Sequence, residues 1–468
     1  MDIPGKRAAL TAAALLLAAV PLLGQGGYGG IGGFGGIFSG AGLGPVRPDV
    51  PSIRPWLGIN GNAASSTYED ETTPVRYGAS VSGGVSISRA WERTRLVGSY
   101  SFVTPIVNTY RYNGMSSGTS HVGGIQLTHR LTQNLTFNLS GMGGSANGGY
   151  GYGGGMGGFA GVGPVGISTA SSSSQSQTSA SSAIIGVQNM ADNGLVDNEL
   201  FGTRVTFSSV QAGLSYSASQ RDIFTLSAGA SRVRRALDYL VGSNSAGFGG
   251  GYTRVLTSRT NTGVHYGFNQ FEYPGYYGGN QLHSLAWSLG SSLTPSVSFN
   301  ISAGAFLYRV NNIGTVTLPS EMAALLGTST VQQVNDVRYK GFSGGAALSK
   351  IFRVGSGSIS YYRGARPGSG YLFATQQETG TGSYSVGWSR FSLGTSAVYS
   401  RGKSISSLTG KVQNKAVIAF GSFRLLGSLH ATGSASHHWI NAGAGPQHRT
   451  MAASAGIAFG PGSYPLWF

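Results

Sequence analysis

The sequence has no cysteine among its 468 residues. This absence excludes disulfide frameworks, Cys-ligated zinc or iron–sulfur centres, cysteine nucleophiles and lipid attachment through an N-terminal cysteine. Charge is also scarce: Asp, Glu, Lys and Arg together make up 10% of the chain, whereas about a quarter is usual for soluble domains. The low charge therefore argues against an ordinary soluble cytoplasmic protein.

Long apolar runs are missing as well. The main one is Ala8–Val20, which follows the basic residues Lys6 and Arg7 and precedes Pro21 and Gly24. It is shorter than the roughly 20 residues that a membrane-spanning helix needs, and its flanks indicate a cleavable secretory signal peptide over residues 1–24. No later segment reaches about 18 uninterrupted apolar residues, so the sequence argues against a helical membrane protein.

Acidic residues are outnumbered: 15 Asp and Glu face 31 Lys and Arg, a net charge of +16. The basic residues are scattered and follow an export signal, so we expect no nucleic-acid partner. Glycine is abundant at 78 residues, but 44 Phe and Tyr indicate that most of the chain folds. The stretch 25–53 is rich in Gly and is expected to be a mobile periplasmic linker.

From about residue 54 the dominant feature is alternation with a period of two residues. Apolar Val81, Val85 and Ile87 alternate with Ser80, Ser82, Ser86 and Ser88, and the pattern recurs at 134–140, 209–217 and 428–439. A period of two is that of a strand with one apolar and one polar face. A chain that spans a membrane without helices must close its strands into a barrel, because every backbone polar group needs a partner in hydrocarbon.

Connections of alternating length set the expected topology. Short turns are predicted near 91–94, 132–133, 219–222, 294–295, 353–355, 389–390 and 426–427, and longer connections at 67–75, 105–119, 143–200, 236–280, 311–336, 367–378, 403–412 and 441–447. We treat the run 254–268 as part of a loop. The prediction is an all-β fold: a closed antiparallel transmembrane β-barrel over 54–468, with about sixteen strands, short periplasmic turns and long extracellular loops.

These features resemble the bacterial outer-membrane β-barrel class, in a member of porin size. The resemblance rests on the signal segment, the strand pattern over 54–460 and the terminal Leu466, Trp467 and Phe468, since a C-terminal aromatic residue serves as the assembly signal in this class. It implies residence in the outer membrane of a Gram-negative bacterium. The implied partners are the barrel-assembly machinery, outer-membrane lipids, lipopolysaccharide and, as in many porins, two further copies in a homotrimer.

Several polar side chains are candidates for the lumen of such a barrel, because we place them on the Ser, Thr and Gln faces of their strands. The set is Arg76, Gln126, Arg130, Arg204, Gln211, His430 and His438. A positive lumen would favour anions. Alternatively, the positive charge would act on the outside of the barrel. Five arginines grouped at the start of a long loop would then contact lipopolysaccharide phosphates: Arg232, Arg234, Arg235, Arg254 and Arg259. The Gly/Ser-rich loop 143–200 would either fold into the pore or cover the outer surface.

Enzymatic motifs are weak. Gly341 to Gly345 match G-x-S-x-G, but the match lies within a predicted strand and is expected by chance in a chain this rich in Gly and Ser. His437 and His438 point to opposite faces of a strand, and we expect no metal or cofactor. The predicted function is a porin-like channel for passive diffusion of small polar solutes, with a preference for anions. The alternative is a barrel without transport that acts as a scaffold, adhesin or exit port for a surface polymer.

Overall fold

The computed structural model describes the part of the chain that forms the strands and their turns. The ranges are 52–68, 71–72, 75–108, 119–146, 204–235, 242–274, 278–317, 330–367, 374–388, 390–404, 411–442, 447–460 and 464–465. The expected signal peptide 1–24 lies outside them, as does almost all of the linker 25–53. Within these ranges the chain has no helix that is long and apolar enough to cross a membrane.

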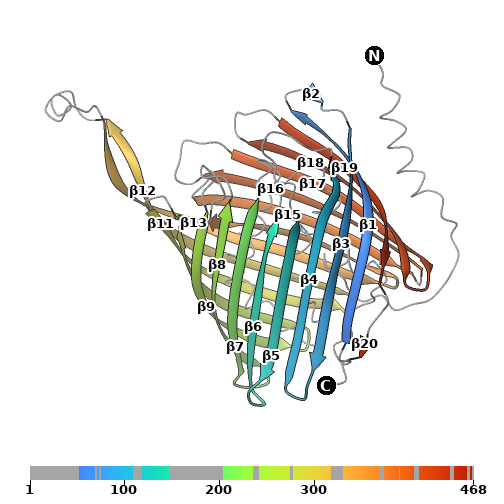
Figure 1. Cartoon of the computed structure of the whole chain (residues 1–468). Helices are drawn as coiled ribbons and strands as arrows, with labels where there is room; N and C mark the ends of the chain where they lie inside the picture. Colours follow the sequence, from blue (N-terminus) through green and yellow to red (C-terminus); the bar gives the residue numbers. More distant parts are fainter. Residues whose placement is uncertain are drawn as a thin grey trace.

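One antiparallel sheet contains every strand (Figure 1). The first half comprises β1 (Ser52–Tyr68), β2 (Glu71–Thr72), β3 (Arg76–Ala90), β4 (Thr94–Asn108), β5 (Ser120–Arg130), β6 (Leu135–Ala146), β7 (Val205–Ser217), β8 (Asp222–Arg235), β9 (Ser243–Thr257) and β10 (Thr260–Glu272). The second half comprises β11 (Gly278–Thr294), β12 (Val297–Thr317), β13 (Thr330–Phe352), β14 (Gly355–Pro367), β15 (Ala374–Gly387), β16 (Phe391–Ser404), β17 (Lys411–Leu426), β18 (Leu429–Ala442), β19 (Gln447–Phe459) and β20 (Tyr464–Pro465).

The sheet closes on itself through its first and last long strands. β1 pairs with β19 over twelve positions, from Leu57 opposite Phe459 to Tyr68 opposite His448. The short β20 then pairs with the start of β1 at Ser52 and Ile53. Leaving out the two-residue β2 and β20, eighteen long strands form the wall. Closure gives the first and last long strands a neighbour on both sides, so that the sheet has no free outer edge, as a barrel in hydrocarbon requires.

The predicted fold class is confirmed, and the two strands beyond sixteen come from the segment 236–280. We expected a long loop there, but β9 and β10 form a hairpin that joins the wall. The pattern was obscured because β9 has glycine at three successive positions of one face, Gly247, Gly249 and Gly251. The predicted loop 143–200 also begins too early, since β6 continues to Ala146, and the rest of that loop lies outside the described residues.

The two ends of the barrel differ in their connections. At one end, the short-turn end, each pair of strands is joined by two to four residues. The turn between β17 and β18 has Gly427 at φ 52°, a left-handed conformation that favours glycine. At the other end, the long-connection end, the links range from four residues to the 58 between β6 and β7. The start of β1 and the short β20 both lie at the short-turn end. This arrangement is that of outer-membrane barrels.

The two faces of the wall follow the alternation in the sequence. On β1, the side chains of Leu57 and Ile59 are 51% and 59% exposed. Those of Arg54 and Trp56, which belong to the other face of the same strand, are each 8% exposed. Side chains diverge on the convex outside of a barrel and converge on its concave inside, so the exposed apolar set faces outward. Large apolar side chains are exposed in the same way on β7, β8 and β11, among them Leu214, Leu226 and Leu285.

One hairpin extends beyond the rest of the wall. β12 and β13 stay paired as far as Thr317 and Thr330, but β13 pairs with β14 only from Gly344 opposite Arg363 to the short turn. The segment 335–343 of β13 therefore has β12 on one side and no pairing to β14 on the other. The hairpin is visible as the projection at the upper left of Figure 1.

Candidate functional site

The inner wall of the barrel carries the polar side chains, and serine dominates it. Cross-strand hydroxyl pairs lie at hydrogen-bond distance along the wall: Ser231–Ser245 at 2.7 Å, Ser298–Ser349 at 2.6 Å, Ser356–Ser385 at 3.1 Å, Ser358–Ser383 at 2.8 Å, Ser360–Thr381 at 2.6 Å, Ser392–Ser422 at 2.7 Å and Ser434–Ser454 at 2.7 Å. Each pair is directly opposed in the strand register, so alternation alone brings the two hydroxyls together. The result is a neutral polar surface on which these paired hydroxyls already have partners.

Positive charge on the inner wall gathers at the short-turn end. Arg54 on β1, Arg95 on β4, Arg130 on β5 and Arg424 on β17 all occupy inward positions there. The Arg95 and Arg130 positions lie on neighbouring strands, because Arg95 is opposite Thr128 and Arg130 follows two residues later. The Arg95 Nε is buried and has no hydrogen-bond partner among the described groups.

No acidic side chain balances these arginines among the inward positions whose side chains the structure describes. Asp222, Glu272, Asp336 and Glu378 occupy outward positions, and Glu92 lies in a short turn. A fifth arginine, Arg235, takes an inward position at the other end of the wall. The described lumen wall is thus neutral along most of its length, with four arginines at its short-turn mouth and Arg235 near the other end.

The predicted lumen residues divide into two groups. Gln126, Arg130, Gln211, His430 and His438 all occupy inward positions. His430 is directly opposite Arg424, and His438 is 8% exposed. Arg76 is the first residue of β3 and pairs with Ala64, but its side chain is not described. These residues lie on different parts of the wall and do not form one compact site.

The lumen position predicted for Arg204 is wrong. Its Nε donates a hydrogen bond of 2.8 Å to the Ser145 Oγ, and Ser145 is opposite Thr206, in the outward row of β7. Arg204 is two residues before Thr206, so it lies on the same outward face as Val210 and Leu214 and not on the inward face of Gln211. A shift of one residue moves a side chain to the other face of a strand, which is why this position was misassigned.

The grouping of five arginines at one loop is also wrong. Arg232 and Arg234 face outward near the long-connection end, and Arg235 takes an inward position beside them. Arg254 is opposite Asp222 at the short-turn end, and Arg259 lies in the turn between β9 and β10. The separation follows directly from the β9–β10 hairpin, which carries the chain back across the wall.

Three further sequence signals can be placed. The G-x-S-x-G match lies within β13, in extended backbone. His437 stacks on Trp439 with ring centroids 3.7 Å apart, while His438 is on the opposite face. Within the described ranges, no group of three or more His, Asp or Glu is placed to hold a metal ion. The proposed assembly signal Leu466, Trp467 and Phe468 lies outside the described residues.

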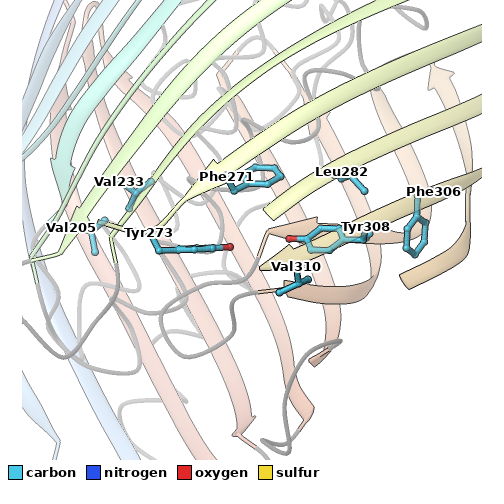
Figure 2. Close-up of a cluster of buried hydrophobic side chains, with 9 residues drawn as sticks. Val205, Val233, Phe271, Tyr273, Leu282, Phe306, Tyr308 and Val310 are labelled. Carbon is cyan, nitrogen blue, oxygen red and sulfur yellow. The ribbon is translucent and has the colours of Figure 1, made fainter. Parts of the chain in front are cut away.

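A feature that sequence reasoning missed is an apolar cluster on the inner side of the wall near the long-connection end (Figure 2). Phe271 and Tyr308 are 0% exposed, and the other members are Val205, Val233, Tyr273, Leu282, Phe306, Val310 and Ala365. Asn280 bridges the two tyrosines: its Nδ2 donates to the Tyr273 hydroxyl at 2.9 Å and to that of Tyr308 at 3.1 Å. This sector of the wall is apolar and closely packed, in contrast to the serine-lined remainder.

Aromatic side chains mark the outer face at two levels. Trp91 lies at a short turn, and Trp388 stacks on Phe391 across another with ring centroids 5.6 Å apart. The rings of Phe224 and Tyr252, with centroids 5.1 Å apart, continue this aromatic band at the short-turn end on β8 and β9. Tyr77 is 62% exposed on the outer face near the opposite end. Aromatic girdles at both interfaces are typical of membrane barrels.

Together, the even number of strands, the apolar outer face with its aromatic bands, and the asymmetric connections define a transmembrane β-barrel of the outer-membrane type. Neither a protein-family model nor a curated protein matches the chain. Solved structures with a similar fold include the outer membrane protein opdK from Pseudomonas aeruginosa, at TM-score 0.43 and 9% identity over 87% of this chain and 98% of that one. Another is the ferric-catecholate import receptor Fiu from E. coli, at TM-score 0.40 and 9% identity over 86% and 81%.

The FrpB iron transporter from Neisseria meningitidis is a third similar structure, at TM-score 0.41 and 10% identity. The match covers 82% of this chain but 61% of FrpB, so the chain spans about three fifths of the length of that protein.

Proposed function

We propose that the protein is an outer-membrane channel through which small polar solutes diffuse passively, with a preference for anions. The observation that carries the proposal is the charge of the described inner wall. Several arginines occupy inward positions, most of them at the short-turn mouth, and none of the carboxylates whose side chains are described does. A charged mouth lined by a low-dielectric wall concentrates ions of the opposite sign. The paired hydroxyls along the rest of the wall offer a neutral polar path.

The Arg95 guanidinium is the group most suited to meet a passing anion. Its Nε is buried without a hydrogen-bond partner, and a buried donor left unpaired is costly. An anion at the mouth would meet the accessible part of this guanidinium and also benefit from the neighbouring position of Arg130. In the outer membrane, the short turns would face the periplasm, as in this class of barrel.

Reconstitution of the protein in planar bilayers with a KCl gradient tests the proposal. The reversal potential is expected to show Cl⁻ preference, and the double variant Arg95→Gln/Arg130→Gln is expected to lose most of it. Arg254→Gln is the matched control, because it removes the same charge at the same end but from the outer face. A cation preference of the unmodified channel would contradict the anion assignment, and the absence of any conductance would favour the barrel without transport.

A further inference from the structure

An apolar groove is present on the outer face of the wall, across β7, β8, β9 and β10. Its volume is about 480 Å³, and eight of the eleven residues that line it face outward. The floor is made of small side chains, Ala212, Ala228, Ala230 and Ala246, and the aromatic rings of Phe248 and Phe268 stand on one side, 5.2 Å apart. Elsewhere on these strands the outward positions carry larger residues such as Leu214 and Leu226.

Two arginines lie directly beyond the groove toward the long-connection end. Arg232 and Arg234 follow Ala228 and Ala230 on the same outward face of β8, and both are exposed. Successive residues on one face are about 6.6 Å apart along a strand. From Phe224 in the aromatic band at the short-turn end to Arg234 the strand advances ten residues, or about 33 Å. A strand tilt of about 40° reduces this to a height of about 25 Å, the height of the apolar band of a membrane barrel. The arginines therefore lie at the outer interface.

Arg232 and Arg234 have no acidic partner among the described residues, and in this they differ from the outward Arg309 and Arg363. Arg309 is paired with Asp336 at 2.8 Å, and Arg363 approaches Glu378 at 3.7 Å. Among the described residues, no carboxylate lies within ion-pair distance of Arg232 or Arg234. Glu272 is in the same row, but Asn244 separates it from Arg232, and it accepts a hydrogen bond from Gln270.

We propose that this surface is a specific site for a phosphorylated lipid of the outer leaflet, lipid A, with a phosphate on Arg232 and Arg234 and an acyl chain in the groove. Charge complementarity identifies the headgroup, because guanidinium groups bind phosphate with two parallel hydrogen bonds. The small floor of the groove identifies the acyl chain, since a chain can lie there in contact with the backbone. The site depends on the barrel crossing the outer membrane, but not on its conducting ions.

Native mass spectrometry of the detergent-purified barrel, titrated with lipid A, measures this binding. Arg232→Gln/Arg234→Gln is expected to weaken lipid A binding at least tenfold. Ala230→Phe fills the groove without changing charge and is expected to weaken it as well. Arg254→Gln is the control, because it removes an exposed outward arginine at the opposite end of the barrel and should leave binding unchanged.

Heat-modifiable migration on gels verifies that each variant is a folded barrel, and conductance of each variant is recorded separately. Two competitors identify the ligand: inorganic phosphate and phosphatidylglycerol should each displace lipid A poorly. The proposal is overturned if both arginine substitutions and Ala230→Phe leave lipid A binding unchanged, or if phosphatidylglycerol competes on equal terms. A barrel that binds lipid A but does not conduct would contradict the proposed channel and leave this site standing.

Discussion

Replacing Tyr308 with alanine should destabilise the barrel more than any other single truncation on β12. The side chain is 0% exposed and packs within the apolar cluster on the inner wall. Truncating a fully buried aromatic side chain to alanine costs about 3–5 kcal/mol. Tyr308→Phe keeps the ring and removes the hydroxyl that accepts from Asn280, whose Nδ2 retains the Tyr273 hydroxyl as acceptor. The expected loss is then about 0.5–1.5 kcal/mol.

Urea unfolding of the protein folded into phospholipid vesicles, followed by tryptophan fluorescence, gives the free energy of unfolding of each variant. Leu307→Ala is the matched control, because Leu307 neighbours Tyr308 but faces outward and is 36% exposed. Its effect should be smaller than that of Tyr308→Ala. The reasoning is refuted if Tyr308→Ala costs less than about 1 kcal/mol, or if Tyr308→Phe costs as much as Tyr308→Ala, since either result would mean that ring packing contributes little.

Two further predictions concern the wall and its turns. Leu226→Lys places a charge on the outer face, at a side chain that is 58% exposed. Near the bilayer midplane this substitution should lower the free energy of unfolding by about 2–4 kcal/mol in the same assay. Thr225→Lys, on the inner face, should lower it much less, and equal losses would contradict the assigned faces. Gly427→Val in the β17–β18 turn should cost about 1–2 kcal/mol because of the positive φ, and an unchanged unfolding free energy would show that the turn relaxes.

The sequence was sufficient to predict the fold class because the wall of a barrel is repetitive. A period of two residues appears in most strands, and each short turn carries the local signals of a hairpin. The β9–β10 hairpin was missed because glycine at Gly247, Gly249 and Gly251 removed the contrast between the two faces. Glycine there leaves space for a neighbour: a Cβ at Gly251 would meet the His265 ring. The contrast is thus lost where packing across strands requires it.

The lumen was predicted less well, for reasons of register and of distance along the chain. Gln126, Gln211 and His438 lie in the inward rows of their strands, whereas Arg204 lies in the outward row. A one-residue error in phase reverses the face. The apolar cluster joins residues from Val205 to Ala365, and their contacts depend on the closed sheet. Local alternation cannot reveal it, since Phe271 and Tyr308 occupy positions that are polar in most other strands.

The projecting β12–β13 hairpin has a consequence for the behaviour of the protein in a crowded membrane. The segment 335–343 presents a strand edge without a pairing partner in the wall, and such an edge can template the addition of a foreign strand. Asp336, Arg338 and Lys340 place charge along this edge, and Asp336 is anchored by Arg309. Charged side chains on an edge strand disfavour edge-to-edge pairing. Replacing these charged side chains with neutral ones would allow copies of the barrel to associate through this hairpin.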